Sequence, residues 1–408
     1  MLKKTGYTFI LLVVIVLAYI NIRLHMSISL QNKEETQKDV LLQLQFIENQ
    51  LKNKDLAIEM QIHYPEGYVF SNVLYGLTWA EIAQKREKSS STYQKGIQEA
   101  LYAYKQINTK YAQSIFPVST KPRYGVFYAG WRNYLLAKIL EIQDFKNEEL
   151  TSTFKQNCNE IAEAFENSST PFLESYQGAS WAADSFVAMM SLHLHDQIFE
   201  PKYQELIRQW IAKTKTLLDT KTQLFSHSTD SITGKTREGT RGSSMALILL
   251  FLSEIDPDFA KEQFELFQKQ FSQTILLLPN IREYPYGTSG VGDVDSGPVV
   301  FGMSPVATIV SVGVFQKFGE YKIADDIFSC IETFGFAYSS KIEKKYLMGK
   351  MPIADIFIAW VRVQNFPKNI NNTARLGSIG VLNTLSFCLI MLILILFERK
   401  RIKKLLKR

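Results

Sequence analysis

The sequence predicts an all-α protein: an (α/α)6 toroid of six helical hairpins, flanked by an N-terminal and a C-terminal transmembrane helix. Three observations lead to this prediction. Amphipathic and apolar helical segments alternate along the body of the chain, the alternation recurs six times, and an uncharged apolar stretch lies near each end. Strand-like alternation of apolar and polar residues is scarce in between.

The first apolar stretch is Tyr7–Ile22, with Lys3 and Lys4 before it and Arg23 after it. It is short for a membrane span but acceptable if the bilayer adjusts. A cleaved signal peptide is the alternative. No small-x-small cleavage motif follows the stretch, so we predict an uncleaved anchor over residues 1–25.

The second apolar stretch, Leu376–Phe397, is 22 residues long and carries no charge, as a transmembrane helix requires. Seven basic residues follow in the tail 398–408 and place the C-terminus in the cytoplasm. Two spans then put both termini inside and the body, residues 26–365 with a linker at 366–375, outside. We expect a bacterial inner-membrane protein whose tail only sets the topology; binding of the tail to anionic lipid headgroups is the alternative.

Composition narrows the classes of function. The chain has 408 residues, 46% of them hydrophobic, and a formal net charge of +6. The tail alone contributes seven positive charges, so the rest of the chain has a net charge of about −1. The body is therefore nearly neutral, and nucleic-acid binding is not expected. The cysteines Cys158, Cys330 and Cys388 form no CxxC or Cys/His cluster, so neither a metal nor a cofactor is predicted. We expect Cys158 and Cys330 to be buried free thiols, with a disulfide between them as the alternative.

The body alternates between two kinds of helix with a period of about 55 residues, which fits one helical hairpin. The polar, amphipathic segments are 32–56, 91–107, 146–165, 201–218, 256–271 and 320–334. The apolar segments begin near residues 71, 129, 179, 242, 298 and 352. An apolar helix belongs inside and an amphipathic one outside, so six hairpins form a ring of two layers. An open α-solenoid is the alternative; closure is favoured by six units and the lack of a polar terminal cap.

This six-unit pattern, over about residues 60–362, resembles the six-hairpin glycosidase-like superfamily. That resemblance implies glycan hydrolysis or lysis at one rim of the toroid. A weaker resemblance is to the linalool dehydratase-isomerase group, which shares the toroid and uses active-site cysteines. No cysteine here falls in a loop that leads into an inner helix.

The loops that lead into the inner helices contain the candidate catalytic and binding residues. The most unusual one is the glycine-rich stretch Tyr284–Pro305, in which Asp295 is expected to cap a helix starting at Pro298. Paired carboxylates can act as acid and base in glycoside hydrolysis, and we predict catalytic roles for Asp293, Asp295, Asp184 and Glu238. Asp355 lies one turn into the last inner helix and belongs to the same set of acids. The predicted substrate-binding residues are Tyr64, Glu66, Tyr128, Trp181, His227, Arg241, Tyr284 and Tyr286.

Aromatic faces with polar tips suit sugar rings, and arginine suits carboxylate or phosphate groups, so a carbohydrate or lipid-linked substrate is expected. The leading hypothesis is a membrane-anchored glycan hydrolase or lyase of the cell envelope. The alternatives are a non-catalytic toroid that binds a glycan or a protein, and a dehydratase or isomerase acting on a lipophilic alcohol.

Overall fold

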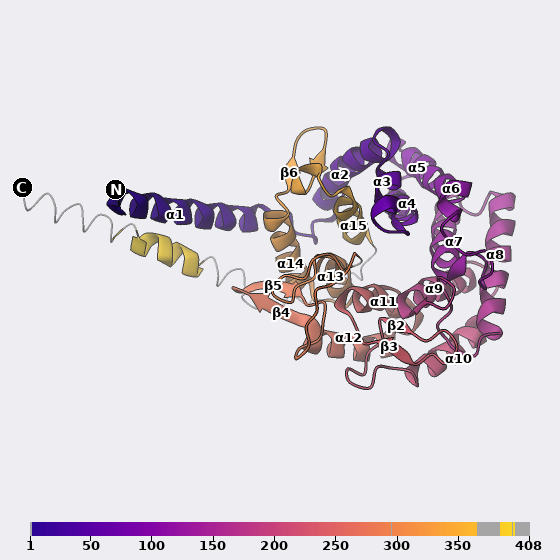
Figure 1. Cartoon of the computed structure of the whole chain (residues 1–408). Coiled ribbons are helices and arrows are strands. Elements are labelled where there is room, and N and C mark those ends of the chain that lie inside the picture. The colour runs from indigo at the N-terminus through magenta and orange to yellow at the C-terminus, as the bar shows by residue number, and fades with distance from the viewer. Residues whose placement is uncertain (1, 295, 365–383, 394, 396–408) are drawn as a thin grey trace, which may run out of the picture.

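The computed structural model describes residues 2–294, 296–364, 384–393 and 395. Six helices form an inner ring, in which each packs against the next and the last packs against the first (Figure 1). The ring is therefore closed, and the open solenoid is excluded. The inner helices are α4 (Gly67–Gln84), α7 (Gly125–Ile142), α9 (Ala182–Ile198), α11 (Gly242–Ile255), α13 (Pro305–Lys317) and α15 (Pro352–Val363).

Six amphipathic helices surround this ring and alternate with the inner helices along the chain, as predicted. Their inward faces are apolar and buried, whereas the inner helices are buried around most of their surface. One continuous hydrophobic core joins the two layers. The outer helices are α2 (Lys33–Asn53), α5 (Ser91–Ile107), α8 (Glu148–Glu166), α10 (Gln204–Lys215), α12 (Pro257–Phe271) and α14 (Tyr321–Phe334).

Short strands and helices lie in the loops that connect the main helices. The strands β1 (Ser180–Trp181), β2 (Ser228–Thr229) and β3 (Thr236–Glu238) form one antiparallel sheet in that order. Two hairpins, β4–β5 (Ser272–Ile275 and Leu278–Ile281) and β6–β7 (Tyr338–Ser339 and Lys344–Lys345), stand apart from it. The remaining elements are α3 (Leu56–His63), α6 (Lys110–Gln113) and a 3-10 turn, η1 (Leu347–Gly349).

Some predicted helix starts are wrong. The fifth inner helix begins at Pro305 rather than near Pro298, and its N-cap is Ser304, whose hydroxyl accepts a hydrogen bond from the Ala307 amide at 3.1 Å. Asp295, predicted as the cap, lies outside the described residues. Residues 298–304 instead form a tight turn closed by hydrogen bonds between Val300 and Met303.

The ring closes through a buried polar cluster where α15 meets α2. The Asp39 carboxylate of α2 accepts hydrogen bonds from Arg362 of α15 and from Lys344 of β7, each at 2.6 Å. Lys344 also pairs with Glu332 of α14 at 2.7 Å. All four side chains are buried. Each charge in this cluster has an opposite partner, as a buried charge requires.

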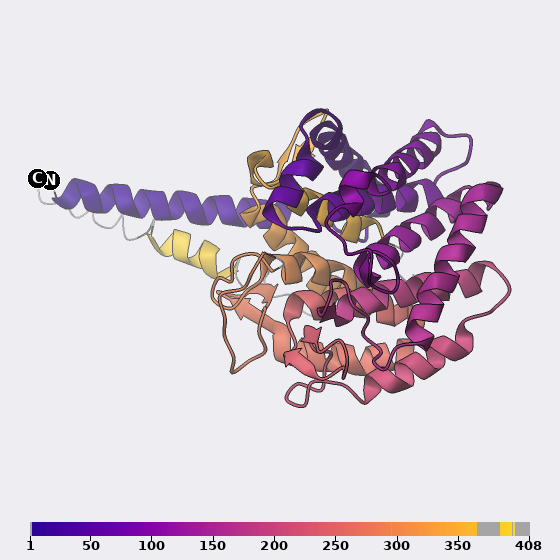
Figure 2. The same ribbon diagram turned by 45° about the vertical axis from the view of Figure 1, so that its right-hand side comes forward.

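The helix α1 (Leu2–Met26) projects from the outer wall of the toroid beside α14, and the helical segment 384–393 runs along it (Figures 1 and 2). The Asn21 amide donates to the Ser386 hydroxyl at 2.6 Å and joins the two segments. In the part of the chain that the structure describes, no helix combines the length and apolar character needed to cross a bilayer. Half of the predicted span Leu376–Phe397 lies outside the described residues, as do the whole linker and the basic tail, and the flanking membrane helices are not confirmed.

Candidate functional site at the toroid rim

The loops that lead into the inner helices gather at one rim. Backbone hydrogen bonds join them: the amide of Gly242, at the start of α11, donates to the Glu283 carbonyl at 2.8 Å, and Ser304 donates to Ile281 at 2.9 Å. Gly242 is required here because a Cβ atom would lie 2.0 Å from the Arg282 carbonyl oxygen. The close approach of these two loops sets the position of Arg241, directly before α11.

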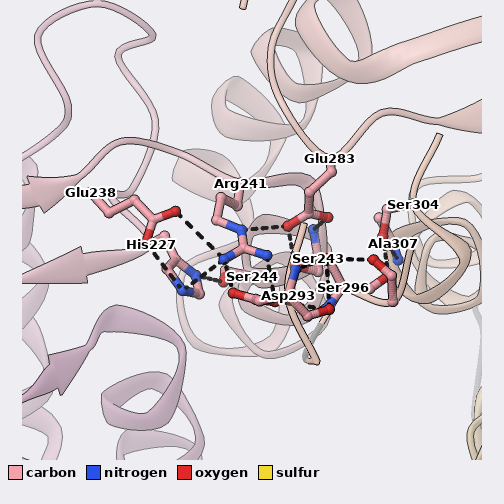
Figure 3. A network of polar contacts seen from close by, with 11 residues as sticks. His227, Glu238, Arg241, Ser243, Ser244, Glu283, Asp293, Ser296, Ser304 and Ala307 are labelled. Carbon is pink, nitrogen blue, oxygen red and sulfur yellow. Dashed lines mark hydrogen bonds and ion pairs between the residues drawn. The ribbon is translucent and has the colours of Figure 1, made fainter. Parts of the chain in front are cut away.

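Arg241 is the centre of a polar network (Figure 3). Its side chain is only 2% exposed. Its Nε donates to Glu283 at 2.6 Å, and its two terminal nitrogens donate to both oxygens of Asp293 in a bidentate pair, with 2.8 Å between Nη2 and Oδ1. The guanidinium group thus joins the buried Glu283, two residues after β5, to the glycine-rich loop that carries Asp293.

Two further side chains complete the network on the side of the small sheet. His227 bonds through Nδ1 to the Ser244 hydroxyl at 2.5 Å and lies 3.4 Å from Arg241 through Nε2. Glu238 of β3 lies 3.5 Å from Arg241 and 3.8 Å from His227, distances too long for strong hydrogen bonds. Glu238 is therefore the loosest carboxylate of the network, and its side chain is 45% exposed.

The surroundings set the charge of each group. Burial favours the neutral form of Asp293, but the hydrogen bonds and charge of Arg241 outweigh it and lower the pKa of Asp293 to about 2. Burial and then the charge of Arg241 lower the pKa of His227 to about 3, so this histidine is neutral at pH 7. Burial raises the pKa of Glu283, which also accepts a hydrogen bond from the Ser243 hydroxyl at 2.8 Å.

A row of side chains extends from this network across the rim. Trp181 in β1 pairs with Ser228 in β2, which pairs with Glu238 in β3. Directly paired residues in an antiparallel sheet point to the same face, so Trp181 and Glu238 flank Ser228 on one side of the sheet. The Trp181 ring meets the Tyr176 ring edge-on at 6.1 Å, and the Tyr176 hydroxyl donates to Glu66 at 2.6 Å. We call Glu66, Tyr176, Trp181, Ser228 and Glu238 the rim row.

Other predicted site residues have defined places. Asp184 accepts a hydrogen bond from the Ser175 hydroxyl at 2.5 Å, near the rim row. Tyr284 lies with its ring 5.8 Å from the Arg241 guanidinium, and Tyr286 donates its hydroxyl to the Ser272 carbonyl at 2.9 Å. Tyr64 donates its hydroxyl to the Met60 sulfur at 3.0 Å.

Two predicted roles need correction. Arg241 was expected to clamp an anionic ligand, but it is buried and its donors already serve Asp293 and Glu283. Tyr128 was expected to contact substrate, but it is buried and donates its hydroxyl to the Ile107 carbonyl at 3.0 Å.

Glu283 and Ser243 were missed in the sequence. The signal was present in the run Leu278–Glu283: Ile281 and Glu283 alternate around Arg282, and both Ile281 and Glu283 are buried. A glutamate on the core-facing side of a strand needs a cationic partner, and Arg241 is that partner. Among the described residues, no group of three or more His, Cys, Asp or Glu side chains is arranged to hold a metal ion.

The fold and the rim network define a closed toroid of six helical hairpins with a polar site at the entrance of its inner helices. The chain is similar in structure to a GH76 alpha-mannanase from Bacteroides thetaiotaomicron, with a TM-score of 0.44, 11% sequence identity, and coverage of 72% of this chain and 84% of that one. No protein-family profile matches the chain. No curated protein sequence matches it either.

Proposed function

We propose that this protein is a membrane-anchored toroid of the cell envelope that binds a glycan along its rim row. The observation that carries this proposal is the row itself: an indole and a phenol ring stand between two carboxylates, Glu66 and Glu238. Aromatic faces stack on the C–H faces of sugar rings, and carboxylates accept hydrogen bonds from sugar hydroxyls. The row extends over loops of several hairpins, which suits an extended ligand.

Binding is favoured over hydrolysis because the rim acids are engaged within the protein. Asp293 is held in a bidentate pair by Arg241, and Asp184 is bonded to Ser175. A general acid needs a carboxyl group that holds its proton near neutral pH, whereas the pKa of Asp293 is lowered to about 2. These acids are suited to shape the rim rather than to transfer protons.

Hydrolysis is the second candidate, and one observation favours it. Glu238 and Asp293 both reach the same nitrogen of Arg241, and their side chains are 45% and 42% exposed. Two partly exposed carboxylates held by one cation supply the pair of acids that glycoside hydrolysis uses. Under this candidate, ionised Asp293 is the base or nucleophile and Glu238 is the acid.

The proposal includes anchoring in a membrane, with the body on the extracytoplasmic face and both termini in the cytoplasm. Its support is the apolar sequence at both ends and the polybasic tail. It is further supported by the many apolar side chains that α1 and residues 384–393 leave exposed, such as Leu11, Ile15, Leu385 and Phe387. An apolar surface of this kind is stabilised by a lipid environment.

The test is glycan binding by the full chain in detergent or nanodiscs, measured by calorimetry against a panel of envelope glycans. We expect Trp181→Ala to weaken binding about tenfold, or about 1.4 kcal/mol, through loss of ring stacking. Glu238→Gln should weaken it less. Tyr338→Ala removes an exposed aromatic ring outside the rim row and is the matched control.

Unchanged affinity in Trp181→Ala would rule out the rim row as the binding surface. Release of new reducing ends from a bound glycan, abolished by both Glu238→Gln and Asp293→Asn while affinity persists, would establish hydrolysis instead of binding alone.

A further inference from the structure

The hairpin β4–β5 ends in an unusual turn. Ile275 pairs with Leu278, which leaves Leu276 and Leu277 as a two-residue connection. Both residues have positive φ angles, 50° for Leu276 and 68° for Leu277. Two successive positive φ angles in a two-residue loop are typical of a type I′ turn, which favours asparagine and glycine.

Leucine is a poor choice for such a turn on local grounds. Its side chain is bulky, and a bulky residue at positive φ is a conformational outlier. The Leu276 side chain is also 81% exposed, so it gains no burial within the protein. Asn-Gly would satisfy the backbone without exposing a hydrophobic side chain. Strain and exposure together at one turn point to a use for the apolar side chains outside the folded chain.

The position of the hairpin indicates what that use is. Its residue Leu278 and Ile20 of α1 both pack against the buried pair formed by Leu24 of α1 and Cys330 of α14. Directly after α14, the Phe336 ring stacks on the Tyr19 ring of α1 at 6.5 Å, and Phe336 is 53% exposed. Figure 1 shows β4–β5 reaching from the ring toward the side on which α1 extends.

Charge at the base of α1 fits a lipid surface as well. Arg23 donates to the carbonyls of Glu332 and Ala337, at 3.2 Å and 2.7 Å, and is thereby fixed at the level where α1 meets the body. A cation held at this level attracts the anionic headgroups of a bilayer, and tyrosine rings such as that of Tyr19 prefer the same interfacial depth.

We propose that the Leu276–Leu277 turn inserts into the interfacial layer of the bilayer and forms a second attachment of the toroid to the membrane. The inference rests on the proposed anchoring through α1 and adds a specific contact to it. With α1 and this hairpin both engaged, the toroid cannot swing freely about a single helix, and its α14 wall faces the lipid.

The first test places a fluorophore on the turn. In a Cys388→Ser background, where Cys158 and Cys330 are buried, Leu276→Cys is labelled in the full chain and reconstituted into phosphatidylethanolamine–phosphatidylglycerol vesicles that contain nitroxide-labelled lipid. Ile232→Cys is the matched control, because Ile232 is 74% exposed in the connection between β2 and β3, far along the ring from α1. Val16→Cys reports on α1. We expect several-fold stronger quenching at positions 276 and 16 than at position 232.

Quenching at position 16 with position 276 equal to the control overturns the second attachment and leaves the anchoring intact. Absence of quenching at position 16 overturns the anchoring and the second attachment with it. A label at position 276 that lipid nitroxides do not quench, but that is shielded from aqueous iodide, means that a protein partner covers the turn, which also overturns the proposal.

The second test changes Leu276–Leu277 to Asn-Gly. This variant suits the turn, so we expect its thermal unfolding temperature to be unchanged or raised. Energy transfer from a label at position 232 to acceptor-labelled lipid headgroups should show a broader range of distances than in the parent chain, because the toroid is no longer held at two points. An unchanged distribution contradicts the proposal.

Discussion

Asp355 shows how the surroundings of one residue decide its role. The sequence places it among the rim acids, but the structure buries it completely at the start of α15. Its Oδ1 accepts a hydrogen bond from the Tyr346 amide at 3.0 Å, and its Oδ2 has no hydrogen-bond partner in the described part of the chain. Burial raises the pKa of Asp355 to about 8 and outweighs the hydrogen bond from the Tyr346 amide, which lowers the pKa. The carboxyl group is therefore mostly protonated at pH 7.

We therefore predict that Asp355→Asn stabilises the protein as the pH rises. A carboxyl group whose pKa is higher in the folded state stabilises fully below its unfolded pKa near 3.8, and this contribution is lost as the pH rises toward 8. Asparagine does not titrate, so the difference in unfolding free energy should grow in its favour by up to about 1.4 kcal/mol per pH unit across this range. Urea unfolding between pH 5 and pH 8 measures it.

The charged group that acts on Asp355 is Lys344, whose ion-pair cluster with Asp39, Glu332 and Arg362 is the same in both proteins. Asp258→Asn, at an exposed position in the first turn of α12, is the control and should leave the pH slope unaltered. A parallel pair of pH profiles for Asp355→Asn and the parent would refute the raised pKa.

Most of the rim network could be named from the sequence, residue by residue, but not its connections. Arg241, Asp293, Glu238 and His227 were all candidates, and the structure brings the four together. Pairing between them depends on the loop crossing at Gly242 and Glu283, which no local pattern encodes. Consequently Arg241 was assigned to the ligand, although it serves the protein's own acids.

At the scale of elements, the start of α13 had two equally good local signals. Both Pro298 and Pro305 follow residues that favour an N-cap. The choice falls on Pro305 because the loop before it is held elsewhere: Glu283 donates its amide to the Gly302 carbonyl at 2.9 Å, and Ser304 donates its amide to Ile281. Tertiary contacts, rather than propensity, select the cap.

Ser304→Ala should therefore destabilise the protein by about 1–2 kcal/mol. The Ser304 hydroxyl caps the Ala307 amide at 3.1 Å and donates to the Ser296 carbonyl at 2.9 Å, so two buried groups lose their partner. Denaturant unfolding measures the change. Ser311→Ala is the matched control on the same helix, because the Ser311 hydroxyl only donates to the Thr308 carbonyl one turn earlier. Equal losses in both variants would show that the cap is dispensable.

The whole ring depends on the contact between its first and last hairpins. The seam is formed by Asp39, Lys344, Glu332 and Arg362, all of them buried. The alternation of helices predicted that such a seam exists, since six equal hairpins close on themselves. It did not identify the residues, because a charged side chain inside an amphipathic segment is normally assigned to the solvent-exposed face.

Arg362→Met should cost about 3–5 kcal/mol, because it leaves one charge fewer to balance the buried acids. Lys88→Met breaks an exposed ion pair with Asp144 on an outer turn and should cost no more than about 1 kcal/mol. Adding Asp39→Asn to Arg362→Met should cost less than the two single losses together, because the two residues share one interaction. Strict additivity would mean that they act independently.

The seam also sets the order in which the protein can be made. Arg362 and Asp39 are 323 residues apart in the chain, so this contact cannot exist until nearly the whole body has been synthesised. Until then, α4 and α13 each lack the neighbour, α15, that covers one side of them. During synthesis, the surfaces of α4 and α13 that α15 later covers stay exposed to solvent. Contacts of such long sequence separation also form slowly. The last helix of the ring to be synthesised, α15, is thus the one that closes it.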